Sequence, residues 1–200
     1  SLGLGESYMD GWWDCKKLDE FIFRVMDADL YKKANLGFRS SINLLVTRFF
    51  NMQVKNKAAG NAQRHYDIGN KLYQFMLDKR MAYTCGYWKN TDNLEQAQEN
   101  KLDLICKKIR LKEGQHVLDM GCGWGTFAKF AAEKYGVKVT GVTVSVNQVE
   151  LGNELCKGLP VEIRLQDYRD VKGKYDHVVA IGLTEHIGYR NYRIFMQTVA

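Results

Sequence analysis

The second half of the chain alternates between short apolar runs and segments with helical spacing. The runs with the length of buried strands are 116–120, 137–142, 161–165 and 177–181. Helical patterns separate them, and the clearest spans 147–157 and ends at Gly158. Strands separated by helices form parallel βαβ units, covered on both faces. We therefore predict an α/β fold with a doubly wound, Rossmann-like parallel sheet.

The residues before this alternation show helical periodicity. We expect helices at 18–30 and 71–77, and a small packed core around Trp12 and Trp13. A longer helix is predicted to begin near Asp92, because Asp92 and Glu95 have the spacing of a capping box. Its inward-facing positions would be Leu94, Ala97, Leu102, Ile105 and Ile109.

Residues 30–66 contain seven Lys and Arg but no Asp or Glu. Apolar residues recur at helical spacing inside this stretch: Phe38, Ile42, Leu45, Val46, Phe49 and Met52. One interpretation is a basic amphipathic helix on an anionic bilayer, with ~1 kcal/mol from each surface Lys or Arg. The other is a core-facing helix with a solvated basic side. The absence of acids favours lipid, and 56–61 is expected to be a linker.

Composition narrows the class of protein. The chain has 200 residues, a formal net charge of +6 and 46% hydrophobic residues, which is typical of a globular protein. No apolar run approaches the ~20 residues of a membrane span, and the start does not resemble a signal peptide. Five scattered cysteines without a Cys-x-x-Cys pair indicate a reducing cytosol, and we predict no metal site. Because only four strands are present, we expect a fragment with a truncated sheet.

The most informative motif is the glycine-rich loop after the first strand. Gly121, Gly123 and Gly125 stand at alternate positions, and helical spacing begins at Thr126. Glycine allows a sharp turn and a close approach of the backbone to a ligand, and the following helix directs its N-terminal N–H groups at the turn. This spacing is tighter than the Gly-x-Gly-x-x-Gly of dinucleotide enzymes. Together with Asp119, which could reach an amino or hydroxyl group, it favours S-adenosylmethionine over NAD; an ordinary glycine-rich turn is the alternative.

Three further loops should meet this one, since ligands lie beyond the carboxyl ends of parallel strands. After the second strand no acid is available for ribose hydroxyls, so Thr143 and Gln148 would have to bond them. After the third strand, Gln166 and Asp167 could bond an adenine amino group while Tyr168 stacks on the ring. After the fourth strand, Glu185 and His186 would face the reaction; surface charge and a capped loop residue are the alternatives.

Several segments together resemble the cyclopropane-fatty-acyl-phospholipid synthase and mycolic acid cyclopropane synthase family. The resemblance spans essentially the whole chain, and its aromatic-cysteine and Glu-His segments are more specific than the glycine loop. A threonine after the second strand is also typical of this family. The matching segments are 1–13, 65–70, 83–88, 118–125, 166–170 and 185–188.

The resemblance implies the reaction: a methylene group passes from S-adenosylmethionine to the cis double bond of an acyl chain. Tyr83, Tyr87 and Trp88 could stabilise the carbocation by cation–π attraction of ~2 kcal/mol. A bound bicarbonate is implied as the base, with Cys85 and Glu185 in its pocket and a further histidine and tyrosine beyond Ala200; the role of His186 stays open. The positions that match cofactor contacts are Tyr83, Thr84, Gly121, Gly123, Thr143, Gln148, Gln166 and Asp167.

The expected organisation follows. Residues 1–60 would be a partial helical lipid-binding domain with its linker, and residues 61–200 a methyltransferase domain without its last strands. We expect a cytoplasmic protein, peripheral to the inner membrane, that acts on unsaturated phospholipid acyl chains; a homodimer is one option. Nucleic acid is not expected as a partner, because the apolar stripe between Phe38 and Met52 offers bases no obvious stacking platform.

Two alternatives stay open at this point. One is a related lipid or sterol methyltransferase that does not close the ring. The other is an inactive, membrane-associated module that only binds S-adenosylmethionine.

Overall fold

The computed structural model describes residues 2–29 and 69–200. The chain divides into two compact units, Ser1–Phe50 and Asn51–Ala200, and each is considered by itself. The basic stretch at 30–66 and the expected linker at 56–61 lie outside the described residues. None of the helices in the described ranges combines the length and the apolar character that crossing a membrane requires.

The first unit contains helices α1 (Leu2–Met9) and α2 (Leu18–Asp27). Helix α2 ends before the predicted Leu30, because Asp29 takes a left-handed φ of 50° that interrupts the helical path. Trp13 packs between the rings of Tyr8 and Phe21, each with its centroid 4.9 Å away. Trp12 is 79% exposed, so the predicted small core holds for Trp13 but not for Trp12.

In the second unit, the first helices within the described residues are α6 (Asn70–Met76) and α7 (Leu94–Lys108). Strands and helices then alternate, as predicted. The remaining elements are β1 (His116–Met120), α8 (Thr126–Tyr135), β2 (Lys138–Thr143), α9 (Val146–Leu155), β3 (Val161–Leu165), the 3₁₀ turn η1 (Tyr168–Asp170), β4 (His177–Val179), α10 (Thr184–Ile187), the 3₁₀ turn η2 (Tyr189–Asn191) and α11 (Tyr192–Val199).

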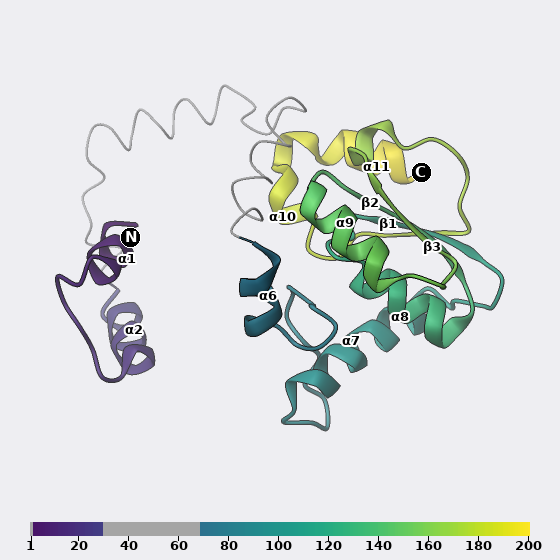
Figure 1. Ribbon diagram of the computed structural model, residues 1–200. Helices are drawn as coiled ribbons and strands as arrows, with labels where there is room; N and C mark the ends of the chain where they lie inside the picture. The colour runs from purple at the N-terminus through teal and green to yellow at the C-terminus, as the bar shows by residue number, and fades with distance from the viewer. Residues whose placement is uncertain (1, 30–68) are drawn as a thin grey trace. The chain divides into compact units, whose positions relative to one another are not determined.

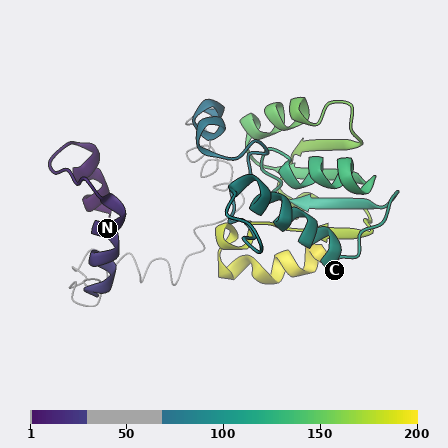
Figure 2. The ribbon, with the colours of Figure 1, turned by 90° about the horizontal axis from the view of Figure 1, so that it is seen from below.

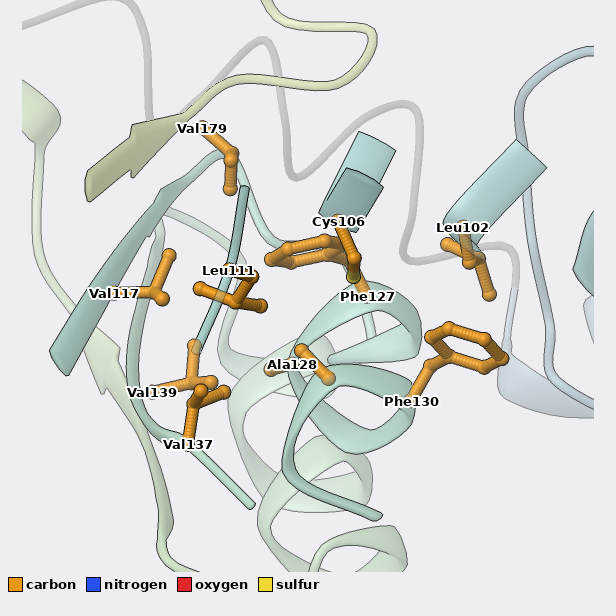
Figure 3. Close-up of a cluster of buried hydrophobic side chains, with 11 residues drawn as sticks. Leu102, Cys106, Leu111, Val117, Phe127, Ala128, Phe130, Val137, Val139 and Val179 are labelled. Carbon is orange, nitrogen blue, oxygen red and sulfur yellow. The ribbon is translucent and has the colours of Figure 1, made fainter. Parts of the chain in front are cut away.

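The four described strands form one parallel sheet in the order β3-β2-β1-β4, with β1 and β2 at its centre (Figures 1 and 2). Alternate side chains of each strand serve opposite layers. One layer joins Val117, Val139 and Val179 to side chains of α7 and α8, which Figure 3 displays. The other layer joins Leu118, Met120 and Val142 to residues of η1, α10 and α11. Apolar helices on both faces make this a doubly wound α/β sheet.

The predicted capping box at the start of α7 is wrong. Asn93 caps the helix, and its side chain accepts a hydrogen bond from the backbone N–H of Gln96. Glu95 takes no part in the cap, and its Oε1 accepts a hydrogen bond from the backbone N–H of Lys79 at 3.0 Å. As a consequence Leu94 is 41% exposed instead of facing inward.

Ile163 of β3 fills the space between two helices and sets how closely they approach the sheet. An ideal Cβ at Gly125 would lie 2.5 Å from the Cδ1 atom of Ile163, and one at Gly152 would lie 2.6 Å from it. Glycine at both positions allows α8 and α9 to pack directly on β3.

Candidate active site

The loop between β1 and α8 is built around three glycines with positive φ: Gly121 at 73°, Gly123 at 57° and Gly125 at 80°. The backbone N–H groups of Gly121 and Cys122 donate to the carbonyl of Val142 and fasten the loop to β2. A Cβ at Gly121 would meet the side chain of Leu183 at 3.0 Å, whereas a Cβ at Gly123 would meet nothing within 4 Å. Gly123 therefore borders open space, and that space is a pocket.

Residues from five segments line the pocket. They come from an arch formed by residues 81–84, from α7, from the stretch that runs from the end of β1 through the glycine loop into α8, from α9, and from the stretch that runs from the turn after β4 into α10. Seven predicted site residues lie together there: Tyr83, Thr84, Asp119, Gly121, Gly123, Gln148 and Glu185. The other predicted site residues, which are not among the lining residues, are Cys85, Thr143, Gln166, Asp167 and Tyr168.

Asp119 is the most unusual group in the pocket. Its side chain is 2% exposed, and Oδ2 has no hydrogen-bond partner in the part of the chain that the structure describes. Burial without a partner penalises the charged form, so desolvation raises the pKa of this carboxyl from 3.8 to about 7. A buried carboxylate oxygen without a donor is a site for a cationic or hydroxyl group of a ligand.

The end of β2 departs from the prediction for Thr143. Its hydroxyl donates to Oε1 of Gln148 at 2.6 Å and accepts from the backbone N–H of Ser145. Because the hydroxyl is buried by these bonds, Thr143 orients Gln148 and does not reach the pocket itself. Of these two residues, only Gln148 lines the pocket.

The loop after β3 also differs from the prediction. Both oxygens of Asp167 accept from Arg169, with Oδ2 2.6 Å from Nη2, and Gln166 donates its amide to the carbonyl of Asp170. Tyr168 is buried edge-on against Phe195, with centroids 5.8 Å apart. The ring is therefore part of the core and cannot stack on an adenine in this conformation.

The arch of residues 81–84 is held against α7 by buried polar side chains. Gln98 donates its amide to the carbonyls of Ala82 and Thr84, and Asp78 accepts from the N–H of Ala82 at 2.7 Å. Lys101 donates its ammonium to the Thr84 hydroxyl at 2.6 Å. Tyr83 stays 55% exposed at the rim, so α7 presents the arch while leaving its aromatic ring accessible.

Met81 begins the arch in a left-handed conformation with φ of 56°, although it is not glycine. Its carbonyl and that of Arg80 accept from the Thr126 hydroxyl at 3.2 and 2.7 Å. Strain of this kind persists only where surrounding contacts over-determine the backbone. Thr126 is on α8, so the first turn after the glycine loop fixes the arch.

Glu185 enters the pocket from α10, beside Gly182. A Cβ at Gly182 would lie 2.7 Å from the methyl of Thr84 and 3.5 Å from Oε1 of Glu185. The absence of a side chain at Gly182 thus allows the arch and the Glu185 carboxylate to share one end of the pocket. His186 is exposed and also lines it.

The chain has recognisable relatives among known proteins. The family model of mycolic acid cyclopropane synthetase matches residues 53–200. The chain is 48% identical over 199 residues to a protein of Escherichia coli (strain K12) named cyclopropane-fatty-acyl-phospholipid synthase, covering 100% of this chain and 52% of that protein. It is 37% identical to the sphingolipid C9-methyltransferase of Komagataella phaffii, covering 88% of this chain and 40% of that one.

The chain belongs to the mycolic acid cyclopropane synthetase family. Among solved structures, mycolic acid cyclopropane synthase CmaA1 complexed with SAH and CTAB superposes with a TM-score of 0.68 at 34% identity, over 70% of this chain and 51% of that one. The predicted Rossmann-like methyltransferase fold is thereby confirmed. The chain spans about half the length of the curated relatives it matches.

The main pocket residue that sequence reasoning missed is Lys101. A signal was present, because Leu94, Gln98, Lys101 and Ile105 are spaced as one stripe of a helix. Two polar residues in a stripe that otherwise contains Leu and Ile indicate that polar side chains form hydrogen bonds on the inward-facing side of the helix. Gln98 is 3% exposed and Lys101 is partly buried, and both hold the arch.

Proposed function

We propose that the pocket binds S-adenosylmethionine. The open space above Gly123 suits a ligand that approaches the backbone closely, and the unpartnered Oδ2 of Asp119 suits an amino or hydroxyl donor. Gln148 would hold the ribose side and Thr84 the amino-acid side. When bound, this cofactor supplies a methyl group on a cationic sulfur.

We further propose that the whole protein transfers a methylene group to the cis double bond of unsaturated phospholipid acyl chains, forming cyclopropane fatty acids. One observation carries this proposal: a single pocket joins the glycine loop and Asp119 to Tyr83 and Glu185. An unactivated double bond is a weak nucleophile, so it must be held close to the methyl group and away from water. The close packing of the arch, α7 and α8 provides such a shielded wall.

The chain's own residues have distinct tasks in this proposal. The accessible face of Tyr83 stabilises positive charge that develops on the attacked alkene, by ~2 kcal/mol when desolvated. Glu185, at the same end of the pocket, holds the base that takes a proton from the transferred carbon so that the ring closes. The base itself is proposed to be bicarbonate, as the family resemblance implies. Cys85 is exposed beside the arch and would complete this site.

Apolar surface beside the arch supports an acyl substrate. Tyr83 packs edge-on against Tyr73 of α6, with centroids 5.4 Å apart. On the same short helix Leu72, Phe75 and Met76 are exposed, and Phe75 is 89% exposed. Exposed apolar side chains on a helix that also packs against Tyr83 are the kind of surface that an acyl chain covers.

Replacing Glu185 with Gln tests the role of the base. In the full-length protein, assayed with unsaturated phospholipid and added bicarbonate, Glu185→Gln should lower cyclopropane formation by about 100-fold or more, within the range of general-base effects. S-adenosylhomocysteine affinity, measured by calorimetry, should change less than about threefold, since Glu185 is proposed to act on the reacting carbon and not on the adenosine. Ring formation at the parental rate would remove Glu185 from the mechanism.

A second candidate reaction is methylation without ring closure, favoured by the similarity to a protein named sphingolipid C9-methyltransferase. Methylene addition and cyclopropanation give products of equal mass, so NMR of the ring protons separates them. A protein that binds the cofactor but produces neither would be the inactive binding module.

The proposal includes a peripheral location on the cytoplasmic side of the inner membrane and residues 1–60 as part of a lipid-binding domain. Binding to anionic vesicles that weakens with added salt tests it. Equal binding to neutral vesicles would contradict an electrostatic contribution. The homodimer stays a prediction, which the mass of the full-length protein in solution would test.

A further inference from the structure

Among the described residues that line the pocket, one is a lysine or arginine, and it is Lys101. The residue stands on α7, between Gln98 and Leu102, and its ammonium reaches the Thr84 hydroxyl at 2.6 Å. No described carboxylate forms an ion pair with it. An ammonium has three donors, so the bond to Thr84 leaves capacity for an anion from a ligand.

The surroundings of Lys101 disfavour a charge that has no partner. Desolvation by burial lowers the pKa of the ammonium, and the electrostatic interactions with Cys85 and Asp78 only partly oppose this effect. Asp78 does not neutralise it directly, because its oxygens accept from the backbone N–H groups of Arg80 and Ala82. An anion that binds here would therefore form a charge-assisted hydrogen bond with Lys101, and its negative charge would offset the desolvation of the ammonium.

Thr84 fixes the position of the ammonium. Its hydroxyl bonds Lys101, while its methyl lies where Gly182 lacks a Cβ. These contacts direct Lys101 to the end of the pocket that contains Glu185. Asp119 supplies a second carboxyl group from β1.

We propose that Lys101, together with the Thr84 hydroxyl, binds the α-carboxylate of the cofactor's amino-acid end. The inference rests on the proposed function. S-adenosylmethionine carries a positive sulfur, a positive amino group and one negative group, the carboxylate. The carboxyl group of Asp119 suits a positive group, and a partly buried ammonium in the same pocket is favourable where it meets the negative one. Lys101 thus distinguishes the complete cofactor from nucleosides that lack the carboxylate.

The test compares two ligands by calorimetry on the full-length protein. One is S-adenosylhomocysteine, and the other is S-adenosyl-3-thiopropylamine, which keeps the amine but lacks the carboxylate. The parent should prefer the first by about 10- to 100-fold, the range of a hydrogen bond to a charged group. Lys101→Met should remove most of this preference, with little change for the second ligand. Lys108→Met, on an exposed position of the same helix, should retain the preference.

The outcomes separate the inference from the function on which it depends. A parent that binds neither ligand contradicts the proposed cofactor site and the inference with it. A parent that binds both equally overturns the inference alone, whether or not the variant folds. Equal weakening of both ligands in Lys101→Met would mean that Lys101 only shapes the arch, and slower turnover with unchanged affinity would assign it to the reaction; either result overturns carboxylate recognition.

Discussion

The loops that follow β1 and β3 occupy equivalent places in the fold, yet their polar groups are used differently. Both begin at the carboxyl end of a parallel strand, and each has an aspartate beside it that could bind a ligand: Asp119 stands one residue before the end of β1, and Asp167 follows β3. At the end of β1, Oδ2 of Asp119 is buried without a partner in the described residues, and Asp119 is among the residues that line the pocket. After β3, both oxygens of Asp167 bond Arg169, two residues away.

Position at a strand end therefore does not by itself make a carboxylate available to a ligand. The guanidinium of Arg169 pairs with Asp167 inside the loop. The Asp167 side chain also caps the 3₁₀ turn η1, because it accepts a hydrogen bond from the backbone N–H of Arg169. Asp119 is followed by glycines and cysteine, which offer it no cation. Availability for a ligand is decided by the immediate sequence neighbours as much as by the fold.

The largest effect is expected for Gly123→Val. A branched side chain at φ of 57° would occupy the open space beside the loop, so affinity for S-adenosylhomocysteine should fall by about 100-fold or more, an energy of about 2.7 kcal/mol. Gly158→Val is the matched control, because Gly158 also has positive φ and open space around it but lies outside the pocket. Calorimetry measures the S-adenosylhomocysteine affinity of both variants. Unchanged affinity in Gly123→Val would show that the glycine loop is not part of the cofactor site.

Asp119→Asn should change stability in a pH-dependent way. The pKa of Asp119 rises from 3.8 to about 7 on folding. At a pH between these two values, the folded protein therefore keeps a proton on Asp119 that the unfolded chain releases. Raising the pH through this window therefore lowers stability. Relative to the parent, the free energy of unfolding of Asp119→Asn should rise by roughly 2 to 3 kcal/mol between pH 5 and pH 8, at ~1.4 kcal/mol for each pKa unit.

Urea unfolding of both proteins without ligand measures this difference, because the other titrating groups cancel. At pH 8 the same variant should bind S-adenosylhomocysteine about tenfold more weakly, since a charge-assisted hydrogen bond is lost. A stability difference that does not depend on pH would mean that Asp119 has a partner when the protein is free.

Asp167→Asn should produce the opposite pattern. Its partner Arg169 is only 14% exposed in its side chain, so breaking the pair should lower the free energy of unfolding by about 1 to 3 kcal/mol. Affinity for S-adenosylhomocysteine should stay within about twofold. A tenfold loss of affinity with intact folding would restore Asp167 as a cofactor contact and break the comparison between the two loops.

The smallest effect is expected for Tyr168→Phe. The hydroxyl is buried without a described partner, so its removal should leave stability unchanged or raise it by up to about 1 kcal/mol. Cofactor affinity should not change, because the ring packs on Phe195. Weaker binding measured by calorimetry would show that Tyr168 can leave the core to contact the ligand.

The fold could be predicted from the sequence where local pattern and tertiary context agree. β3 has its predicted bounds, 161–165, and the glycine loop connects β1 to α8 as its spacing indicates. The structure differs from the expectations where a polar side chain has several hydrogen-bond partners within a few residues. Asn93 replaced Asp92 as the cap of α7, and Thr143 bonded Gln148 instead of facing the pocket. Lys101 was missed because its importance depends on Thr84, seventeen positions earlier in sequence.

The contact of Ile163 with two glycines has a consequence for sequence variation. Gly152 has no positive φ, so only lack of space excludes a side chain there: Cδ1 of Ile163 at 2.6 Å and the carbonyl oxygen of Trp124 at 3.1 Å. Gly125 carries a φ of 80° and stays glycine whatever its neighbour becomes. Positions 152 and 163 should therefore evolve as a pair, with alanine at 152 tolerated only in lineages whose residue at 163 has first become shorter.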